Sequence, residues 1–238
     1  MESPLLPVER HLPAAASIPA ETTASILLAA QSKRGRLIKR AGDIVFSLLV
    51  LTLGSPLFLL LALLVKLSSK GTVFYSQRRI GRGYKGFGCL KFRTMRKDAD
   101  RVLASVLASN PELKAEFQRD FKLKNDPRIT PIGKFLRRSS LDELPQFINV
   151  LKGQMSVVGP RPIVWEELER YGRAMDEVLS VRPGLTGLWQ VSGRNNLSYA
   201  TRVRLDLRYA RCRNVWLDLR IILRTVGVIL LPMDRGAY

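Results

Sequence analysis

The sequence predicts a mixed α+β protein, mainly helical, with one re-entrant helix hairpin in a membrane and a cytoplasmic domain that has interfacial amphipathic helices. Three observations predict this class: an apolar run at 44–65, helical apolar spacing in the second half, and one pair of short β-rich segments. The 238 residues suffice for one domain. We predict a disordered tail at 1–32, a basic lead with the membrane hairpin at 33–70, and the cytoplasmic domain at 71–238.

The apolar run decides the topology. As a helix, 44–65 would reach about 33 Å, enough to cross a hydrocarbon core. Basic residues flank both ends, with KRGRLIKR at 33–40 and four Lys and Arg residues within 66–79, and both clusters suit the cytoplasmic side. Ser55 and Pro56 interrupt the run, and proline breaks a helix because it has no amide hydrogen. We therefore predict that the chain turns at this pair and returns, with a kinked full span as the alternative.

The charge of the chain indicates its partners. The 39 Lys and Arg residues against 20 Asp and Glu give a net charge of +19, which favours anionic partners. Given a lipid-embedded segment, we expect the inner leaflet and phosphorylated molecules, and no nucleic acid; a generic basic surface is the alternative. Since the one histidine is His11, in the tail, proton transfer would fall to carboxylates, Lys or Tyr. Cys89 and Cys212 lack metal-type spacing, which fits a reducing compartment.

A β-hairpin should follow the membrane segment. The stretches 72–81 and 87–95 are rich in β-branched and aromatic residues, and a glycine-punctuated turn separates them. Two-residue alternation puts Lys91 and Arg93 on the same face of the second strand. The alternative is that both are solvated charges on an edge strand.

Helices and loops fill the rest of the chain. In order, we expect a helix over 98–122 interrupted near Asn110-Pro111, a loop over 124–133, a helix that begins after Ser139 or Ser140, a short strand within 155–165 that runs into a Gly-Pro-Arg-Pro turn, a helix over 166–179, a long loop over 181–196, and helices over 198–212 and 216–231. The last helix is largely apolar, so it lies either in the membrane interface or in the core.

Two adjacent carboxylates are the first candidates for chemistry. Asp142 and Glu143 fall in the first turn of a predicted helix, where the helix dipole favours negative charge. Neighbouring side chains project about 100° apart, so one could attack while the other holds a divalent metal. Arg137 and Arg138 should keep Asp142 ionised, and an ionised carboxylate can attack phosphorus. The alternative is that the dipole alone explains the acids.

Three rigid turns present polar side chains. Arg161 lies between two prolines, so its guanidinium has little entropy to lose when it binds a phosphate. Arg182 precedes a Pro-Gly pair, and Arg194 and Asn195 follow a glycine. Arg182, Arg194 and Asn195 are candidates for nucleotide-binding or loop residues.

Together these stretches resemble the bacterial sugar transferases, monotopic phosphoglycosyl transferases that initiate polysaccharide assembly. The shared motifs are KR at 39–40, the Ser-Pro break, KFRTM at 91–95, SLDELPQ at 140–146, NVLKGQMSVVGPRP at 149–162 and RPGLTGLWQVSGRN at 182–195. The resemblance covers about 37–238. SYATR at 198–202 and the ending RGAY are similar to the short exopolysaccharide-initiating proteins that attach galactose-1-phosphate to undecaprenyl phosphate.

The resemblance assigns roles to residues of this chain. It implies that Asp142 is the nucleophile, that Glu143 is its partner in binding Mg²⁺, and that both are metal ligands. It implies that Arg137, Arg161 and Lys91 bind substrate phosphate. The domain that carries them would be a phosphoglycosyl transferase domain on the cytoplasmic face of the bacterial inner membrane.

The implied reaction moves hexose-1-phosphate from a UDP-hexose to undecaprenyl phosphate through an aspartyl-phosphosugar on Asp142, with release of UMP. Galactose is the first choice of hexose and glucose is the alternative, because no residue can be assigned to reading the C4 hydroxyl. The rival classes are an inverting glycosyltransferase, which would release UDP, and a non-enzymatic membrane adaptor that binds anionic lipid. A homo-oligomer remains open.

Overall fold

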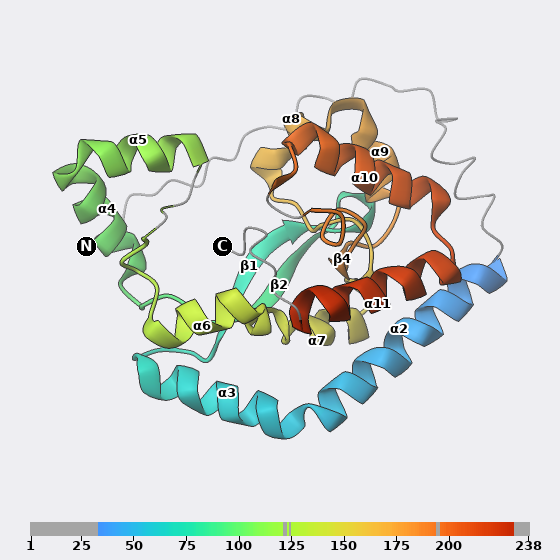
Figure 1. The fold of residues 1–238 in the computed structure, drawn as a ribbon, viewed down its shortest axis with the longest axis horizontal. Helices are drawn as coiled ribbons and strands as arrows, with labels where there is room; N and C mark the ends of the chain where they lie inside the picture. The colour runs from blue at the N-terminus through green and yellow to red at the C-terminus, as the bar shows by residue number, and fades with distance from the viewer. Residues whose placement is uncertain (1–32, 121–122, 124, 194–195, 231–238) are drawn as a thin grey trace.

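The computed structural model describes residues 33–120, 123, 125–193 and 196–230. In this part of the chain, helices surround a β-hairpin and a short two-stranded parallel sheet (Figure 1). The predicted mixed α+β class, mainly helical with a small hairpin, is confirmed. The predicted tail at 1–32 lies outside the described residues.

The elements run in chain order as follows. The helices are α2 (Lys33–Leu53), α3 (Ser55–Ser68), α4 (Ala99–Ser109), α5 (Pro111–Asp120), α6 (Pro131–Ser139), α7 (Gln146–Leu151), α8 (Leu168–Tyr171), α9 (Met175–Leu179), α10 (Tyr199–Cys212) and α11 (Val215–Leu230). The strands are β1 (Phe74–Ile80), β2 (Gly86–Phe92), β3 (Ser156–Val158) and β4 (Gly184–Thr186), and the 3₁₀ turns are η1 (Arg82–Tyr84), η2 (Leu141–Glu143), η3 (Trp165–Glu167) and η4 (Gly172–Ala174).

Helices α2 and α3 form a pair bent by 66°. The break lies at Gly54, and Ser55 and Pro56 are the first two residues of α3, so the predicted position is confirmed to within one residue. The Ser55 hydroxyl donates to the carbonyl oxygen of Thr52 at 2.8 Å, which satisfies one of the carbonyls near the break. Within the described residues, no single helix has the length and apolar content needed to cross a membrane, whereas this bent pair has them jointly.

Polar contacts attach the first half of α2 to the domain. Arg40 donates to two carbonyl oxygens at the end of α7, at 2.6 and 2.9 Å. Asp43 is 5% exposed and accepts hydrogen bonds from Ser156 Oγ at 2.8 Å and from the Val157 amide at 3.1 Å. This half of the helix is therefore held against β3 and α7.

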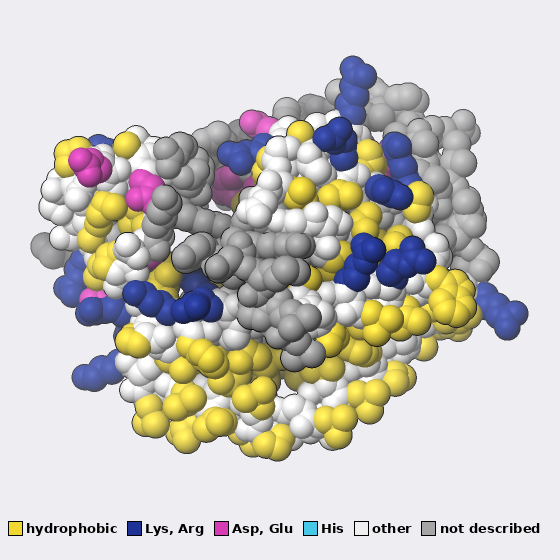
Figure 2. All heavy atoms as spheres, in the orientation of Figure 1, with side chains coloured by type: hydrophobic (Ala, Val, Ile, Leu, Met, Phe, Trp, Pro, Cys, Tyr) yellow, Lys and Arg dark blue, Asp and Glu magenta, His cyan; other side chains and the backbone are white. Residues whose placement is uncertain are grey.

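The outer faces of α2, α3 and α11 carry the exposed apolar side chains of this region. They are Leu37, Ile38, Val45, Leu48, Leu49 and Leu53 on α2, Leu57, Leu59, Leu60, Leu63, Leu64 and Leu67 on α3, and Val215, Trp216, Leu219, Leu223 and Val226 on α11. Figure 2 shows hydrophobic side chains gathered over these three helices. We call this set the apolar surface. Exposed apolar patches of such extent mark a site of contact with another protein or a membrane.

The predicted hairpin is confirmed. Strands β1 and β2 pair antiparallel, with Tyr75 opposite Lys91. Asn149 of α7 is 1% exposed and binds the free edge of β2: its Oδ1 accepts from the Leu90 amide at 2.9 Å and its Nδ2 donates to the Gly88 carbonyl at 2.7 Å. One asparagine side chain thus satisfies two backbone groups of this edge and attaches the hairpin to α7.

Two local predictions around the carboxylates were only partly right. The loop expected over 124–133 ends early, because α6 begins at Pro131 with Thr130 as its cap; Thr130 Oγ1 accepts from the Gly133 amide at 3.0 Å. The helix expected after Ser139 or Ser140 begins as the 3₁₀ turn η2, which carries Asp142 and Glu143, and becomes α-helical only at α7; Ser140, with a left-handed backbone at a φ of 58°, ends α6 before it.

Two later predictions were also incomplete. The helix expected over 166–179 is broken into short pieces at Gly172, whose φ is 49°. The loop expected over 181–196 contains β4, which pairs in parallel with β3. The interruption between α4 and α5 and the two C-terminal helices α10 and α11 are confirmed.

Candidate active site

Apolar contacts on both sides of the two carboxylates fix the turn that carries them. Leu141 and Leu144 flank Asp142 and Glu143 and pack against a cluster whose buried members are Leu61, Val65, Phe92 and Leu136. This cluster joins α3, β2 and α6. Turn η2 is thereby held between the second half of the bent helix pair and the end of the hairpin.

The structure brings Lys91 to both carboxylates. Its Nζ lies 2.6 Å from Glu143 Oε1 and 4.0 Å from Asp142 Oδ2. Burial alone would lower the pKa of Lys91, but the charges of Glu143 and Asp142 outweigh it and raise that pKa. Lys91 therefore stays a cation, and the alternative that it is a solvated surface charge is wrong.

Arg93 does not join this site. Strand β2 ends at Phe92, and the Arg93 guanidinium donates to the carbonyls of Val65 and Ser69, at 3.2 and 2.6 Å, at the end of α3. It satisfies carbonyl groups that the helix leaves free.

Burial raises the pKa of Asp142 to about 6, with Glu143 adding to the rise while Lys91 and Arg137 oppose it. The prediction that basic neighbours keep Asp142 ionised did not include burial: the side chain is 11% exposed and loses most of its hydration, which moves its pKa upward. Asp142 is therefore a mostly ionised carboxylate that titrates close to neutral pH.

Glu143 is shifted in the other direction. Its side chain is 40% exposed, and although burial opposes ionisation, the ion pair with Lys91 outweighs it and lowers the pKa of Glu143. Adjacent carboxylates whose pKa values are pushed apart are typical of sites where the two have different tasks.

Arg137 is placed to bind an anion beside Asp142. Its Nε donates to Thr94 Oγ1 at 3.0 Å, and its charge lowers the pKa of Asp142. Its two terminal nitrogens hydrogen-bond to no other part of the described chain, so they are available to a phosphate.

Arg161 lies over an indole ring. Its Cζ lies 5.7 Å from the centre of the Trp189 ring, and that of Arg202 lies 5.2 Å from the same ring. The charge of Arg161 also contributes to the lowered pKa of Glu143, which places its guanidinium within electrostatic reach of the site.

Close backbone packing holds the turn that carries Arg161. The Gly159 amide donates to the Thr186 carbonyl at 2.9 Å, and the Gly184 amide donates to the Pro160 carbonyl at 2.8 Å. A Cβ on Gly184 would meet the backbone of Gly159, so only glycine permits this approach.

Several buried polar atoms near this turn have no hydrogen-bond partner in the described part of the chain. They are Trp189 Nε1, Gln190 Oε1, Tyr199 OH and Asp206 Oδ1. Unsatisfied buried polar groups are rare and often line the site of a ligand or ordered water.

The remaining candidates lie elsewhere. Arg182 donates from Nε to the Gly153 carbonyl at 2.8 Å and lines a separate cavity. Arg194 and Asn195 lie outside the described residues. Ser55 and Pro56 mark the break between α2 and α3.

Sequence reasoning missed three residues that the structure adds to the site. Thr94 orients Arg137 and stands inside the KFRTM motif, so the motif itself was a signal. Trp189 stands in the same way in RPGLTGLWQVSGRN. Arg202 lies within SYATR on α10, and nothing in the sequence indicated that it would share the Trp189 ring.

The carboxylate pair fits a magnesium ion that arrives with its substrate. Mg²⁺ is usually held by one or two carboxylates together with substrate phosphates and water, and Asp142 and Glu143 offer two adjacent carboxylates. In the described ranges, no group of three or more His, Cys, Asp and Glu residues could hold a metal. A dedicated protein cage for a metal is therefore not seen in this part of the chain.

Comparison with known proteins gives the family. The model of the family described as bacterial sugar transferase matches residues 34–232. A Sinorhizobium fredii protein described as exopolysaccharide production protein ExoY is 49% identical over 204 residues, which are 86% of this chain and 89% of that protein.

Two further relatives are longer. A Salmonella typhimurium undecaprenyl-phosphate galactose phosphotransferase is 50% identical over 206 residues, 87% of this chain and 43% of that protein. An Escherichia coli UDP-glucose:undecaprenyl-phosphate glucose-1-phosphate transferase is 42% identical over 200 residues, 80% of this chain and 40% of that protein. The chain thus spans less than half the length of these two. Since the family model covers most of the chain, including the Asp142 site, this protein belongs to the bacterial sugar transferase family.

Proposed function

We propose that the protein transfers hexose-1-phosphate, with galactose as the hexose, from UDP-hexose to undecaprenyl phosphate and so initiates an exopolysaccharide repeat unit. The observation that carries this proposal is the buried carboxylate of Asp142, whose pKa is raised to about 6, beside the cation Lys91. The names of the Sinorhizobium and Salmonella relatives support the product class and the sugar.

The proposed location is the cytoplasmic face of the inner membrane. The bent pair of α2 and α3 and the apolar surface support a re-entrant insertion into one leaflet. A polyprenyl phosphate cannot leave the bilayer, so the nucleophile must stay close to the lipid surface. Leu141 and Leu144 meet this need, because they pack the turn that carries Asp142 against α3.

In the first half-reaction, a carboxylate oxygen of Asp142 attacks the β-phosphorus of the UDP-hexose. The bond from this phosphorus to the bridging oxygen breaks, and UMP leaves. Arg137 and Arg161 bind the phosphate oxygens, while Lys91 favours the ionised form of Asp142. Mg²⁺ held by Asp142 and Glu143 would supply neutralisation of the diphosphate charge.

In the second half-reaction, a phosphate oxygen of undecaprenyl phosphate attacks the phosphorus bound to Asp142. The acyl phosphate bond breaks, the lipid diphosphosugar forms, and the carboxylate returns to its starting state. Neither step requires a net proton transfer, which agrees with a site that has no histidine among its described residues.

The test measures the nucleotide product. Purified protein in detergent is incubated with UDP-galactose or UDP-glucose, with and without undecaprenyl phosphate. We expect UMP, faster with UDP-galactose, and a mass gain of one hexose phosphate on the protein when the acceptor is omitted. Asp142→Asn should abolish both signals, whereas Asp100→Asn, a change of an exposed carboxylate on α4, should leave them unchanged.

Each rival predicts a different result. UDP as the product would indicate an inverting glycosyltransferase, and no nucleotide release with any UDP-sugar would indicate a non-enzymatic adaptor. Faster turnover of UDP-glucose would favour the alternative sugar, which the name of the Escherichia coli relative supports. Full turnover by Asp142→Asn would refute covalent catalysis at this position.

A further inference from the structure

A second basic site lies apart from the Asp142 site. It is a cavity of about 430 Å³ at the start of α2. Six cations line it: Arg36, Lys39, Arg40, Arg82, Arg182 and Arg213. Of the described residues that line it, Asp43 alone carries a carboxylate.

The carboxylates near this cavity, Asp43 and Asp218, already have partners inside the protein. Asp43 accepts from Ser156, from the Val157 amide and, at 3.4 Å, from Lys39. Lys39 also pairs with Asp218 Oδ2 at 2.7 Å. The charge of Lys39 is thus balanced inside the protein.

Three of the arginines, Arg40, Arg82 and Arg182, form no ion pair with any described residue. Arg40 and Arg182 donate to backbone carbonyls at the end of α7 and at Gly153, and Arg213 NH1 donates to the Ala210 carbonyl at 2.8 Å. Carbonyl groups fix the direction of a guanidinium without cancelling its charge.

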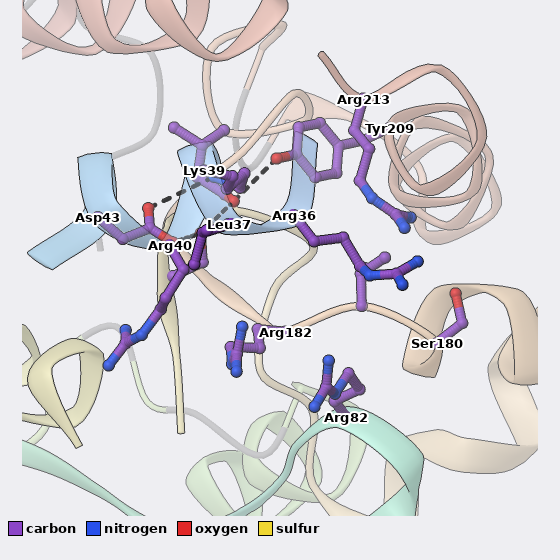
Figure 3. A pocket seen from close by; sticks show the side chains of 13 residues that line it. Arg36, Leu37, Lys39, Arg40, Asp43, Arg82, Ser180, Arg182, Tyr209 and Arg213 are labelled. Carbon is purple, nitrogen blue, oxygen red and sulfur yellow. Dashed lines mark hydrogen bonds and ion pairs between the residues drawn. The ribbon is translucent and has the colours of Figure 1, made fainter. Parts of the chain in front are cut away.

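The arginines repel one another across the cavity. Burial lowers the pKa of Arg182, and the charges of Arg82 and Arg40 lower it further. Burial also lowers the pKa of Arg213, and Arg36 and Arg82 contribute in the same direction. Figure 3 shows Arg36, Arg82 and Arg182 arranged around one space although they come from α2, η1 and the approach to β4. An anion in that space would remove the repulsion.

The cavity and the Asp142 site lie at opposite ends of the hairpin. Arg82 belongs to the turn that connects β1 to β2, which begins at Gly86. Lys91 lies five residues after Gly86, so it is about 16 Å from that end of the hairpin at the usual rise of a strand. Arg40 binds the end of α7, whereas η2 precedes its beginning. One phosphate group cannot contact both sites.

We propose that this cavity binds a phosphate group carried by a second ligand, which the arginines grip through paired N–H donors. Guanidinium groups match phosphate oxygens in a two-pronged geometry, which suits a cavity lined by arginine rather than lysine. Leu37 also lines the cavity and is 70% exposed, so a ligand with an apolar chain beside its phosphate, such as an anionic phospholipid, fits this mouth. A soluble phosphate compound is the other source of the same group. The proposal does not depend on the chemistry of Asp142.

Binding to the full-length protein in neutral detergent tests the proposal. The probes are dihexanoyl phosphatidylglycerol, dihexanoyl phosphatidylcholine and inorganic pyrophosphate, each titrated by microscale thermophoresis. We expect phosphatidylglycerol to bind more tightly than phosphatidylcholine, and Arg82→Gln to weaken its binding roughly tenfold, since a hydrogen bond to a charged group is lost. Arg78→Gln, a change of an exposed arginine on β1 that does not line the cavity, should have no effect.

The outcomes separate the two sources. Pyrophosphate binding that Arg82→Gln weakens, without phosphatidylglycerol binding, would support the site and assign a soluble ligand. Arg82 is exposed in a turn, so its variant should fold, and circular dichroism checks this. The proposal is overturned if neither anionic probe binds, if phosphatidylcholine binds equally well, or if the double variant Arg36→Gln/Arg82→Gln binds like the wild type.

Discussion

Replacing Lys91 by glutamine should move the acid limb of the pH profile upward. Lys91 Nζ lies 4.0 Å from Asp142 Oδ2, and at that distance two unit charges interact by about 4 kcal/mol at an effective dielectric constant of 20. That value corresponds to about 3 pKa units, and measured effects of one neighbouring charge run from about 1 to 3 units. From its value of about 6, the pKa of Asp142 should therefore rise to between about 7 and 9.

The consequence for turnover follows from the ionised fraction. At pH 7, Asp142 is about nine-tenths ionised in the wild type and between about one half and one hundredth ionised in Lys91→Gln. If ionised Asp142 attacks phosphorus, UMP release at pH 7 should fall about twofold to a hundredfold and recover as the pH is raised. Bound Mg²⁺ would lower the pKa in both proteins, so the difference between their profiles is the quantity to measure.

The assay is the initial rate of UMP release from pH 5 to 9.5, at saturating Mg²⁺ and substrates. Lys91→Arg is the matched control, because it keeps a cation and should keep the acid limb near its wild-type position. The reasoning is refuted if Lys91→Gln loses the same factor at every pH, since Lys91 would then act on binding alone and not on the ionisation of Asp142.

Three further changes test the fold. Burial raises the pKa of the Asp206 carboxyl to about 7, so the wild type loses stability as the pH rises from about 4 to 7. Asp206→Asn has no carboxyl to ionise, so its unfolding free energy should gain ~4 kcal/mol relative to the wild type across that window. Urea unfolding at each pH measures the difference. Asp43→Ala leaves buried donors without an acceptor and should lower the unfolding free energy by about 2–4 kcal/mol, whereas a change under about 0.5 kcal/mol would contradict the attachment of α2. At Ser140, whose φ is 58°, glycine should match or exceed the wild type in thermal stability while valine loses about 1–2 kcal/mol; equal losses would show that the left-handed backbone does not matter.

Local chemistry determined what could be predicted from the sequence. The break at Ser55-Pro56 and the interruption before Pro111 follow from the missing amide hydrogen of proline, which acts within one turn of helix. The hairpin follows from alternation and from a glycine-rich turn of short range. These features need no information about distant parts of the chain.

Helix α6 shows why other elements could not be predicted. Gly133 weakens the helical pattern after Thr130-Pro131, so the stretch resembles a loop. Gly133 is needed because of a tertiary contact: a Cβ at this position would meet the Thr94 carbonyl, 39 residues earlier in the chain. The Thr130 amide donates to the same carbonyl at 3.0 Å. Strand β4 is similar, because its three residues are a strand through their pairing with β3.

The candidate active site likewise has features that the local sequence predicted and features that depend on tertiary packing. The basic residues near Asp142 in the sequence predicted an ionised carboxylate, and the family resemblance grouped Asp142 with Lys91, which the structure places 4.0 Å away. Burial, which depends on how Leu141 and Leu144 pack, raises the pKa of Asp142 to about 6 although Lys91 and Arg137 lower it. Arg182 had the same rigid setting as Arg161 in the sequence, yet it faces Gly153 and a different cavity.

One buried cluster links the bent helix pair to the ionisation of Asp142. Strand β2 contributes Phe92 to the cluster that holds α3 and η2, and the adjacent Lys91 supplies the cation beside both carboxylates. Arg93, the next residue, binds the carbonyls at the end of α3. Three consecutive residues thus fix the helix, the turn and the cation to one another, so a displacement of α3 would carry Asp142 and Lys91 together. If α2 and α3 insert into a membrane and Asp142 attacks there, as proposed, this rigidity would keep the charge around Asp142 constant while the helix pair moves.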